Sequence, residues 1–280
     1  MSPTELGSYY DGLSRFLRAA RWVSRSSDAS LTVHRLLIPD QQDVAPHDAV
    51  HARLLRALGP LDAPRVIDAG CGLGGTAFYL HARLGGLYDG ITLSAEQRDR
   101  ADKAAHKRGV ANACRFHVRS YDHDLSNLVG EGADLVVAIE SLAHSPDPAN
   151  TIRNLAGTLR RGGRLAVIDD VPGEDLPDED ADFRAFRSGW RCEDIARLSE
   201  LKAAIGAAGL ELERDEDLTP RVIMRNPTRR ERLARVNRRV RALLGTSALA
   251  EVVDSLHGGL MLERLYARRL MQYRMLVARR

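Results

Sequence analysis

The chain has 280 residues, 44% hydrophobic and 28% charged, and a formal net charge of +3 at pH 7. This length suits one large domain, or a core domain with an added lid. The small net charge does not by itself indicate nucleic-acid binding, and no apolar run reaches membrane-spanning length. The N-terminus lacks the apolar segment of a signal peptide. Three scattered cysteines, Cys71, Cys114 and Cys192, predict free thiols in a reducing, cytoplasmic setting.

Residues 1–60 are expected to form an N-terminal helical cap or lid. Apolar residues recur at helical spacing between Leu13 and Val23, and a second such group lies between Leu54 and Leu58, just before Pro60. The stretch between the two groups is polar and contains Pro39 and Pro46. We therefore expect this part of the chain to lie outside the sheet.

Strands and helices alternate over residues 61–220, which predicts an α/β fold with a doubly wound, mostly parallel, Rossmann-like sheet. The fourth expected strand is a continuous apolar run, typical of a strand covered on both faces. Ser94 is a favourable N-cap for the helix that runs through Arg108. The expected strands are Val66–Asp68, Tyr88–Leu93, Cys114–Val118, Ala133–Ile139 and Arg164–Ile168; the expected helices follow Gly75, follow Ser94 and span Pro148–Leu159.

The last third departs from this pattern. Residues 171–182 are rich in Pro, Asp and Glu and predict a surface loop. A basic helical insertion is expected over residues 221–250, before the last strand. The other expected elements are a helix near Glu193–Ala208, a strand at Leu210–Arg214 and, within residues 251–280, the helix Leu256–Leu270 and the closing strand Tyr273–Ala278.

The arginines of residues 221–241 allow two interpretations. Most such runs are a solvated helix face paired with acids. They could also recognise an anionic substrate, such as a carboxylate or a diphosphate, because Arg binds these groups bidentately. No aromatic residues interleave with these arginines, so nucleic-acid binding is not favoured.

The most informative segment joins the first strand to its helix and reads Asp68-Ala69-Gly70-Cys71-Gly72-Leu73-Gly74. Glycines let the backbone turn sharply and approach a ligand, and the following helix presents free N–H groups. Gly70, Gly72 and Gly75 also satisfy the dinucleotide pattern G-x-G-x-x-G, which is a weak signal alone. Asp68 argues against a dinucleotide, because a buried carboxylate needs positive charge or donors and would repel a pyrophosphate. A ligand with an ammonium group would satisfy it.

This segment resembles the D-x-G-x-G-x-G motif of class I S-adenosylmethionine-dependent methyltransferases. The resemblance implies a seven-stranded sheet and S-adenosyl-L-methionine as cofactor, held by Asp68, Gly70, Gly72 and Gly74, with S-adenosyl-L-homocysteine as product. It covers residues 65–170 with specific motifs and extends loosely to the chain's end. A glycine-rich turn without a ligand remains the plain alternative.

The end of the second strand, Gly90-Ile91-Thr92-Leu93-Ser94 followed by Gln97, resembles the cyclopropane-fatty-acid synthase, sterol and tocopherol methyltransferase branch. The resemblance implies that Thr92, Leu93 and Gln97 contact the cofactor, with Thr92 and Gln97 holding the ribose. The alternative makes Ser94 a helix cap and Gln97 a surface residue. After the third strand, Ser120 and Tyr121 are expected at the adenine.

Two further segments concern the reacting end. Glu140 to Asp147 resembles the E-[AS]-x-x-H-x-P-D segment of the sterol and tocopherol branch, so Glu140 is expected to face the methionine end and the incoming substrate. His144 could accept a proton from a substrate nucleophile, or could cap the loop without transferring protons. Tyr10 resembles an aromatic residue that covers the cofactor, where its ring would attract the sulfonium; core packing of the lid is the alternative.

Asp169 and Asp170 close the fifth strand. Catechol-type methyltransferases hold a divalent cation with acids at this place, but further ligands are not identifiable here, so we expect a structural role and no metal.

Together these features predict in-line methyl transfer to an O, N or C atom of a small organic acceptor, a specialised metabolite of a bacterium. The resemblance to the sterol and tocopherol branch implies an apolar or isoprenoid-like acceptor. Glu140 and His144 are the expected catalytic residues, because either could stabilise or deprotonate a carbocation formed by C-methylation. We expect no nucleic-acid partner and allow a homodimer. The alternatives are an NAD-dependent oxidoreductase and a non-catalytic methyltransferase-like binding protein. An RNA methyltransferase is disfavoured, because the fourth strand is not followed by the N/D-P-P-[YF] motif of adenine N6 enzymes.

Overall fold

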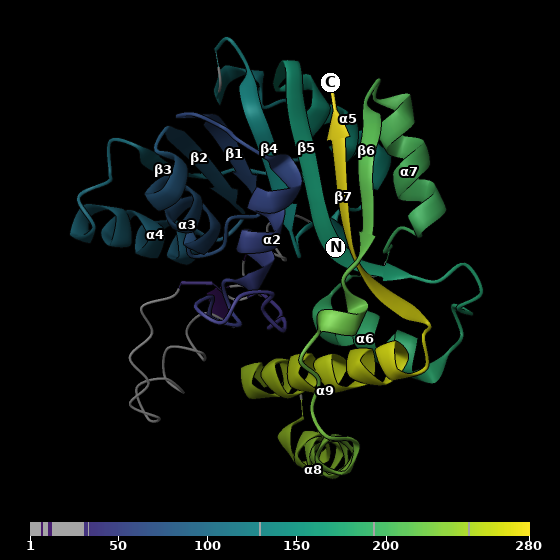
Figure 1. The fold of residues 1–280 in the computed structure, drawn as a ribbon. Coiled ribbons are helices and arrows are strands. Elements are labelled where there is room, and N and C mark those ends of the chain that lie inside the picture. Colours follow the sequence, from purple (N-terminus) through teal and green to yellow (C-terminus); the bar gives the residue numbers. More distant parts are fainter. Residues whose placement is uncertain are drawn as a thin grey trace.

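The computed structural model describes residues 7, 11–12, 31–32, 34–128, 130–192, 194–245 and 247–280 (Figure 1). In this part of the chain, seven strands form one sheet in the order β3-β2-β1-β4-β5-β7-β6. Neighbours from β3 to β5 pair in parallel, whereas β7 is antiparallel to both β5 and β6. The strands are β1 Arg65–Ala69, β2 Leu87–Thr92, β3 Cys114–Val118, β4 Ala133–Ile139, β5 Leu159–Pro172, β6 Glu211–Asp217 and β7 Met271–Arg279. The predicted doubly wound, mostly parallel, seven-stranded sheet is confirmed.

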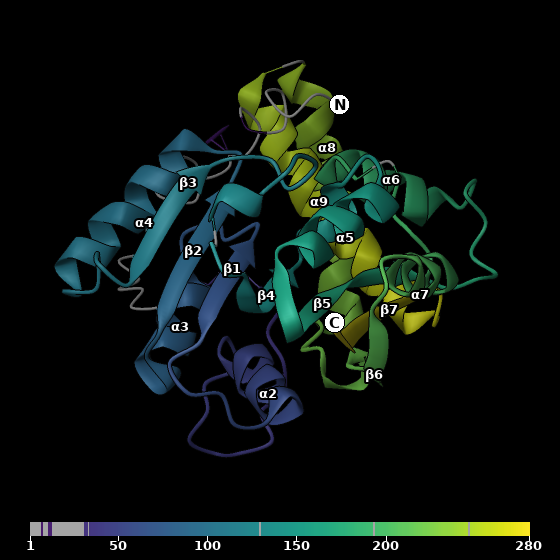
Figure 2. The same cartoon turned by 90° about the horizontal axis from the view of Figure 1, so that it is seen from above.

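Helices cover both faces of the sheet (Figure 2). The face covered by α2, α3 and α4 buries one apolar cluster, and the face covered by α5 and α7 buries a second. Strand β4 supplies Leu135 and Val137 to the first cluster and Val136 and Ala138 to the second, as its continuous apolar run predicts. The helices are α2 Ala49–Leu58, α3 Gly75–Leu84, α4 Ala95–Lys107, α5 Pro148–Gly157 and α7 Leu198–Ala207.

Three more helices lie beyond the carboxyl ends of the parallel strands: α6 Ala181–Trp190, α8 Pro227–Leu244 and α9 Ala248–Ala267 (Figure 1). Helix α6 packs on α9 through Phe186 and Trp190. The two helices lie so close that a Cβ added to Gly258 of α9 would fall 2.8 Å from the Trp190 ring. Helix α8 lies outside α9 and is the outermost element at this end of the molecule (Figure 1).

Three predicted element bounds in this region differ from the structure. Residues 173–180 form the predicted loop, but residues 171–172 end β5, and α6, which was not predicted, begins directly after its N-cap Asp180, which accepts hydrogen bonds from the Asp182 and Phe183 N–H groups. The helix predicted near Glu193–Ala208 begins only at Leu198. Helix α9 also begins earlier than expected, at Ala248.

The N-terminal cap is described only in part. The predicted helix around Leu13 to Val23 and the side chain of Tyr10 lie outside the described residues. Helix α2 matches the predicted second helix and buries Val50 and Leu54 in the same cluster as α3. Ahead of it, Leu37 forms a β-bridge with Val222, which ties the cap to the segment that precedes α8. No helix within the described ranges has the length and apolar character that crossing a bilayer requires.

Candidate functional site

The first part of the site is a buried acid beneath the glycine turn. Strand β1 places Asp68 in the interior with 2% exposure, where the Ala77 N–H of α3 donates to its carboxylate. The second oxygen, Oδ2, is buried and has no hydrogen-bond partner among the described residues. Burial raises the pKa of Asp68 to about 7, despite the opposing hydrogen bond from Ala77. An orphaned buried acceptor is costly unless a ligand supplies the missing donor.

The turn itself has the shape of a cradle. Gly70, Gly72 and Gly74 have φ values of 83°, 52° and 81°, which L side chains rarely adopt. The N–H groups of Gly70 and Cys71 both donate to the Ile91 carbonyl at 2.9 Å, so the turn is anchored on β2. A Cβ on Gly74 would lie 2.6 Å from the Phe116 ring. Side chains at positions 70 and 74 would therefore collide with their neighbours, so the turn requires glycine there.

The end of β2 forms the second part of the site. The Thr92 hydroxyl donates to Gln97 Oε1 at 2.8 Å, so the pair predicted for the ribose is brought together. Ser94 is confirmed as the N-cap of α4 and accepts from the Gln97 N–H. Asp11 lies beside this turn and accepts from the Ser94 hydroxyl, and Leu93 lies against Gly7, where an added Cβ would be 2.7 Å from its carbonyl oxygen. Residues of the cap thus cover the predicted ribose site.

The two residues expected at the adenine have local partners. Ser120 donates to Asp122 Oδ2 at 2.8 Å. The Tyr121 side chain is buried in the cluster beneath α5, and its hydroxyl donates to the Ser141 carbonyl at 2.6 Å. The Tyr121 carbonyl accepts from Asn154 Nδ2 at 3.3 Å, and the residue is buried, so the adenine contact stays a prediction.

The third part of the site lies at the ends of β4 and β5. Glu140 has a φ of 50° and is held by its N–H, which donates to the Ile168 carbonyl at 2.8 Å. Its Oε1 accepts from the backbone N–H of Arg35 at 2.7 Å and from the Tyr273 hydroxyl at 2.9 Å. Burial raises the pKa of Glu140, while the charge of Arg35 opposes the rise. A strained backbone of this kind is common at functional sites.

Arg35 also binds the neighbouring acid. Its guanidinium donates to Asp170 through Nε at 3.0 Å and Nη2 at 2.5 Å, and Asp170 accepts a further hydrogen bond from the Tyr266 hydroxyl. The guanidinium lies 5.2 Å from the centre of the Trp190 ring and 5.5 Å from that of Tyr266. Arg35, Trp190, Tyr266 and Tyr273 were not among the predicted site residues, because no local pattern in the sequence connects them to Glu140.

His144 and Asp169 shape the loop after β4. Asp169 accepts from the Leu142 N–H at 2.8 Å and the Ala143 N–H at 3.2 Å, which is a structural role. His144 is half-buried and hydrogen-bonds to the backbone of Arg191, and desolvation lowers its pKa to about 4. The ring is therefore neutral at pH 7 but a weak base. This favours loop capping over proton transfer for His144, whose catalytic role stays a prediction.

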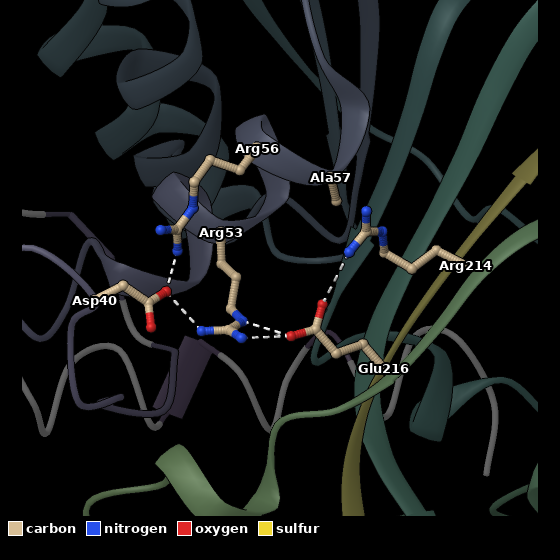
Figure 3. A pocket seen from close by; sticks show the side chains of 6 residues that line it. All are labelled: Asp40, Arg53, Arg56, Ala57, Arg214 and Glu216. Carbon is tan, nitrogen blue, oxygen red and sulfur yellow. Dashed lines mark hydrogen bonds and ion pairs between the residues drawn. The ribbon is translucent and has the colours of Figure 1, made fainter.

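Among the described residues, no group of three or more His, Cys, Asp and Glu side chains is placed to hold a metal ion. A surface cavity of about 420 Å³ lies elsewhere, between α2 and β6 (Figure 3). Its charges satisfy one another: Arg53 donates to Asp40 at 2.6 Å and to Glu216 at 2.7 Å. No residue predicted for the site lines this cavity; its lining is Asp40, Arg53, Arg56, Ala57, Arg214 and Glu216. The paired charges hold the cap to the sheet edge.

Comparisons with known proteins place this arrangement in context. The sequence profile of a family described as a methyltransferase domain matches residues 67–167. Methyltransferase GfsG of Streptomyces halstedii is 28% identical over 213 residues, which cover 74% of this chain and 73% of that protein. The 27-O-demethylrifamycin SV methyltransferase of Amycolatopsis mediterranei is 35% identical over 170 residues, 59% of this chain and 61% of that protein.

One solved structure resembles the fold over its whole length. It is geranyl diphosphate C-methyltransferase from Streptomyces coelicolor, in complex with Mg2+, geranyl diphosphate and S-adenosyl-L-homocysteine. The TM-score is 0.73 at 20% identity, and the match covers 100% of this chain and 98% of that chain. At this identity the likeness concerns the fold alone.

Proposed function

We propose that this chain, which belongs to the class I S-adenosylmethionine-dependent methyltransferases, transfers a methyl group to a small apolar acceptor. One observation supports it above the others: the Asp68 carboxylate is buried beneath the glycine turn with an oxygen that has no partner among the described residues. The ammonium group of an amino-acid ligand supplies the charge and the donors that this oxygen lacks. The pyrophosphate of a dinucleotide would instead bring a second negative charge.

The residues at the first two strand ends fit the cofactor of this family. Asp68 would hold its amino-acid end, the backbone of Gly70 to Gly74 would lie against it, and Thr92 with Gln97 would hold the ribose hydroxyls. When bound, S-adenosyl-L-methionine supplies a methyl group that its sulfonium has already made electrophilic. The protein is then left to orient the acceptor in line with that methyl group and to exclude water.

The third part of the site suits an apolar acceptor with one proton to lose. The Trp190 and Tyr266 rings lie 5.2 and 5.5 Å from the Arg35 guanidinium that binds Asp170, so aromatic surface adjoins the two acids. Glu140 uses Oε1 for Arg35 and Tyr273, and no donor to its Oε2 is recorded among the described residues. Burial raises the pKa of Glu140 and lowers that of His144, which favours Glu140 as the proton acceptor. We therefore assign proton acceptance to Glu140, and loop positioning to His144.

The relatives agree with this acceptor class. The rifamycin methyltransferase acts on a natural product, and the structural neighbour is named for geranyl diphosphate, an isoprenoid. We propose an acceptor of the same broad kind, a specialised metabolite of apolar or isoprenoid character. A cytoplasmic setting is proposed with it, since Cys71, Cys114 and Cys192 are all free and buried. The homodimer and the lack of a nucleic-acid partner stay predictions.

Calorimetry with the full chain tests the cofactor. We expect S-adenosyl-L-homocysteine to bind and NAD not to bind, and Asp68→Ala to weaken S-adenosyl-L-homocysteine at least tenfold, about 1.4 kcal/mol. Asp62→Ala is the matched control, because Asp62 is an exposed acid just before β1. Binding of NAD, or equal affinity of the Asp68→Ala and parent chains for S-adenosyl-L-homocysteine, would reject the cofactor assignment.

An acceptor panel tests the substrate class. Incubation of the parent chain with S-adenosyl-L-methionine and separate phenol, amine and prenyl acceptors should add one methyl group to a prenyl or similarly apolar acceptor, detected by mass spectrometry. Exclusive transfer to phenols would contradict the acceptor class while leaving the methyltransferase assignment intact. Cofactor binding without transfer to any acceptor would favour the non-catalytic alternative.

A further inference from the structure

Helix α8 is the most basic element of the described chain. It carries seven arginines and a single acid, Glu231, over the residues Pro227–Leu244. One face of the helix is fixed to α9. There, Arg264 donates to Glu231 at 2.9 Å, Arg241 donates to Asp254 at 2.8 Å, and Arg230 donates to the Glu263 carbonyl at 3.2 Å.

The opposite face of α8 has no partner within the described chain. On this face four arginines are exposed and make no hydrogen bond or ion pair with described residues: Arg229, Arg232, Arg235 and Arg239. A fifth exposed arginine, Arg238, lies close enough to His257 of α9 for its charge to lower the pKa of that histidine. Beside them, Val236, Val240 and Leu243 are 46%, 37% and 86% exposed. Their spacing of four and three residues places these side chains along one stripe of the helix. Ile223 and Met224, just before the helix, are also exposed.

We propose that this face of α8, formed by the four exposed arginines and the stripe Val236, Val240 and Leu243, docks on a bilayer surface that carries anionic phospholipid. Basic side chains beside an exposed apolar stripe are the pattern of a helix that lies in the membrane interface. The positive charge complements the lipid head groups. Transfer of the apolar stripe from water into the interface lowers its free energy. A helix face that only contacts solvent would have no need of such a stripe.

The position of α8 agrees with this orientation. Helices α8 and α9 lie beyond the carboxyl ends of the parallel strands, at the same end of the molecule as Glu140 and Asp170 (Figure 1). Docking through α8 would turn that end toward the lipid. An apolar acceptor partitions into lipid, so the enzyme would meet it there; this last step rests on the proposed function, whereas docking itself does not.

Vesicle sedimentation with the full chain tests the docking, in the absence of cofactor and acceptor. We expect binding to vesicles of phosphatidylcholine with 30% phosphatidylglycerol to be at least tenfold tighter than to phosphatidylcholine alone, and to weaken at high salt. The triple change Arg232→Gln, Arg235→Gln and Arg239→Gln should lower binding to the anionic vesicles at least tenfold. Leu243→Ser should lower it severalfold at unchanged charge.

The matched control removes three positive charges elsewhere, through Lys107→Gln, Arg153→Gln and Arg161→Gln, at exposed positions on other elements. It should retain most of the vesicle binding, and thermal melting should be unchanged in every variant. Equal losses in the α8 and control variants, equal binding to neutral vesicles, or tighter binding to single-stranded RNA than to anionic vesicles would each overturn the proposal. Failure of methyl transfer would leave the vesicle result unaffected.

Discussion

Gly70 occupies a position where both the backbone conformation and the neighbouring side chain require glycine. Its φ is 83°, and a Cβ there would lie closer than 3.0 Å to the Cβ of Ser141. Ser141 cannot move away freely, because its hydroxyl donates to the Ala69 carbonyl at 2.7 Å and its own carbonyl accepts from Tyr121. The turn above Asp68 is thus held by contacts between β1, β4 and the loop after β3.

Gly70→Ala should therefore destabilise the protein by more than backbone strain alone. Strain from positive φ costs about 1–2 kcal/mol, and the overlap with Ser141 adds roughly 1–3 kcal/mol. Gly109→Ala is the matched control, because Gly109 has a φ of 72° and nothing within 4 Å of its added Cβ. Urea unfolding measures both changes. Equal free-energy losses at the two positions would show that the contact with Ser141 does not constrain the turn.

At the level of elements, residues 34–37 act as a strap across the ends of the central strands. His34 hydrogen-bonds to Thr76 at the start of α3, and Leu37 pairs with Val222. Between them Arg35 binds Glu140 through its backbone and Asp170 through its guanidinium. The strap thereby links the glycine turn, where α3 begins, to Glu140, which directly follows β4.

Removal of the Arg35 side chain should loosen this strap. Arg35→Ala leaves Asp170 buried at 3% exposure with Tyr266 as its remaining side-chain donor, and we expect a loss of about 3–5 kcal/mol in urea unfolding. The double change Arg35→Ala with Asp170→Asn removes the unpaired charge and should recover a large part of the loss. Hydrogen exchange at residues 34–37 should be faster in the single variant.

Arg184→Ala serves as the control for that comparison. Arg184 pairs with Glu179 on the surface, with side chains 60% and 86% exposed, so its loss should cost less than about 1 kcal/mol. If Arg35→Ala is as mild as Arg184→Ala, or if the double variant is less stable than the single one, Arg35 does not hold the strap through Asp170.

The elements that sequence could predict are those with a local signal. Strands β3 and β4 have the predicted bounds. The apolar run of β4 is ended by Glu140, whereas in β3 the buried Cys114 and Phe116 alternate with the polar Arg115 and His117. Strand β5 runs further than predicted because β7 pairs with it as far as Pro172, a partner more than 90 residues away. Helix α6 was missed because its start lies inside an acidic, proline-rich stretch.

The same distinction applies to the site. Asp68, the glycines, Thr92 with Gln97, and Glu140 stand in motifs at strand ends, so their proximity could be predicted from the topology. The partners of Glu140 and Asp170 could not. Asp170 is contacted by Arg35 and Tyr266, which lie 135 and 96 positions away in the sequence, and Glu140 by Tyr273, which lies 133 positions away. From the sequence alone, each of these partners is indistinguishable from an ordinary cap or core residue.

The whole molecule contains two sets of buried groups that respond to pH in opposite directions. Burial raises the pKa of Asp68 and Asp169 from 3.8 to about 7, so their favourable contribution to folding is complete below pH 3.8 and is lost as pH rises to about 7. Burial lowers the pKa of His34 and His144 from 6.5 to about 4, so their contribution is present above pH 6.5 and is lost as pH falls to about 4. Between pH 4 and 7 the two sets offset each other.

Asp68→Asn should separate these contributions, because it keeps the side-chain shape and the acceptor for the Ala77 N–H but removes the buried charge. At pH 8 the ligand-free variant should be more stable than the parent by at least about 1 kcal/mol, or roughly 2–4 °C in Tm. The difference should shrink as pH falls and vanish only below pH 3.8, where Asp68 becomes protonated in both the folded and the unfolded parent. Acidification from pH 7 to 5 should also destabilise the variant more than the parent, since the histidine contribution is then less offset.

Addition of S-adenosyl-L-homocysteine at pH 8 should raise the Tm of the parent and not that of the variant, because only the carboxylate gains from the ligand's ammonium group. A variant that melts below the parent at pH 8, or a difference that does not change with pH, would mean that Asp68 is not held at a cost to stability in the free protein, and the reason for assigning it to the cofactor would be lost.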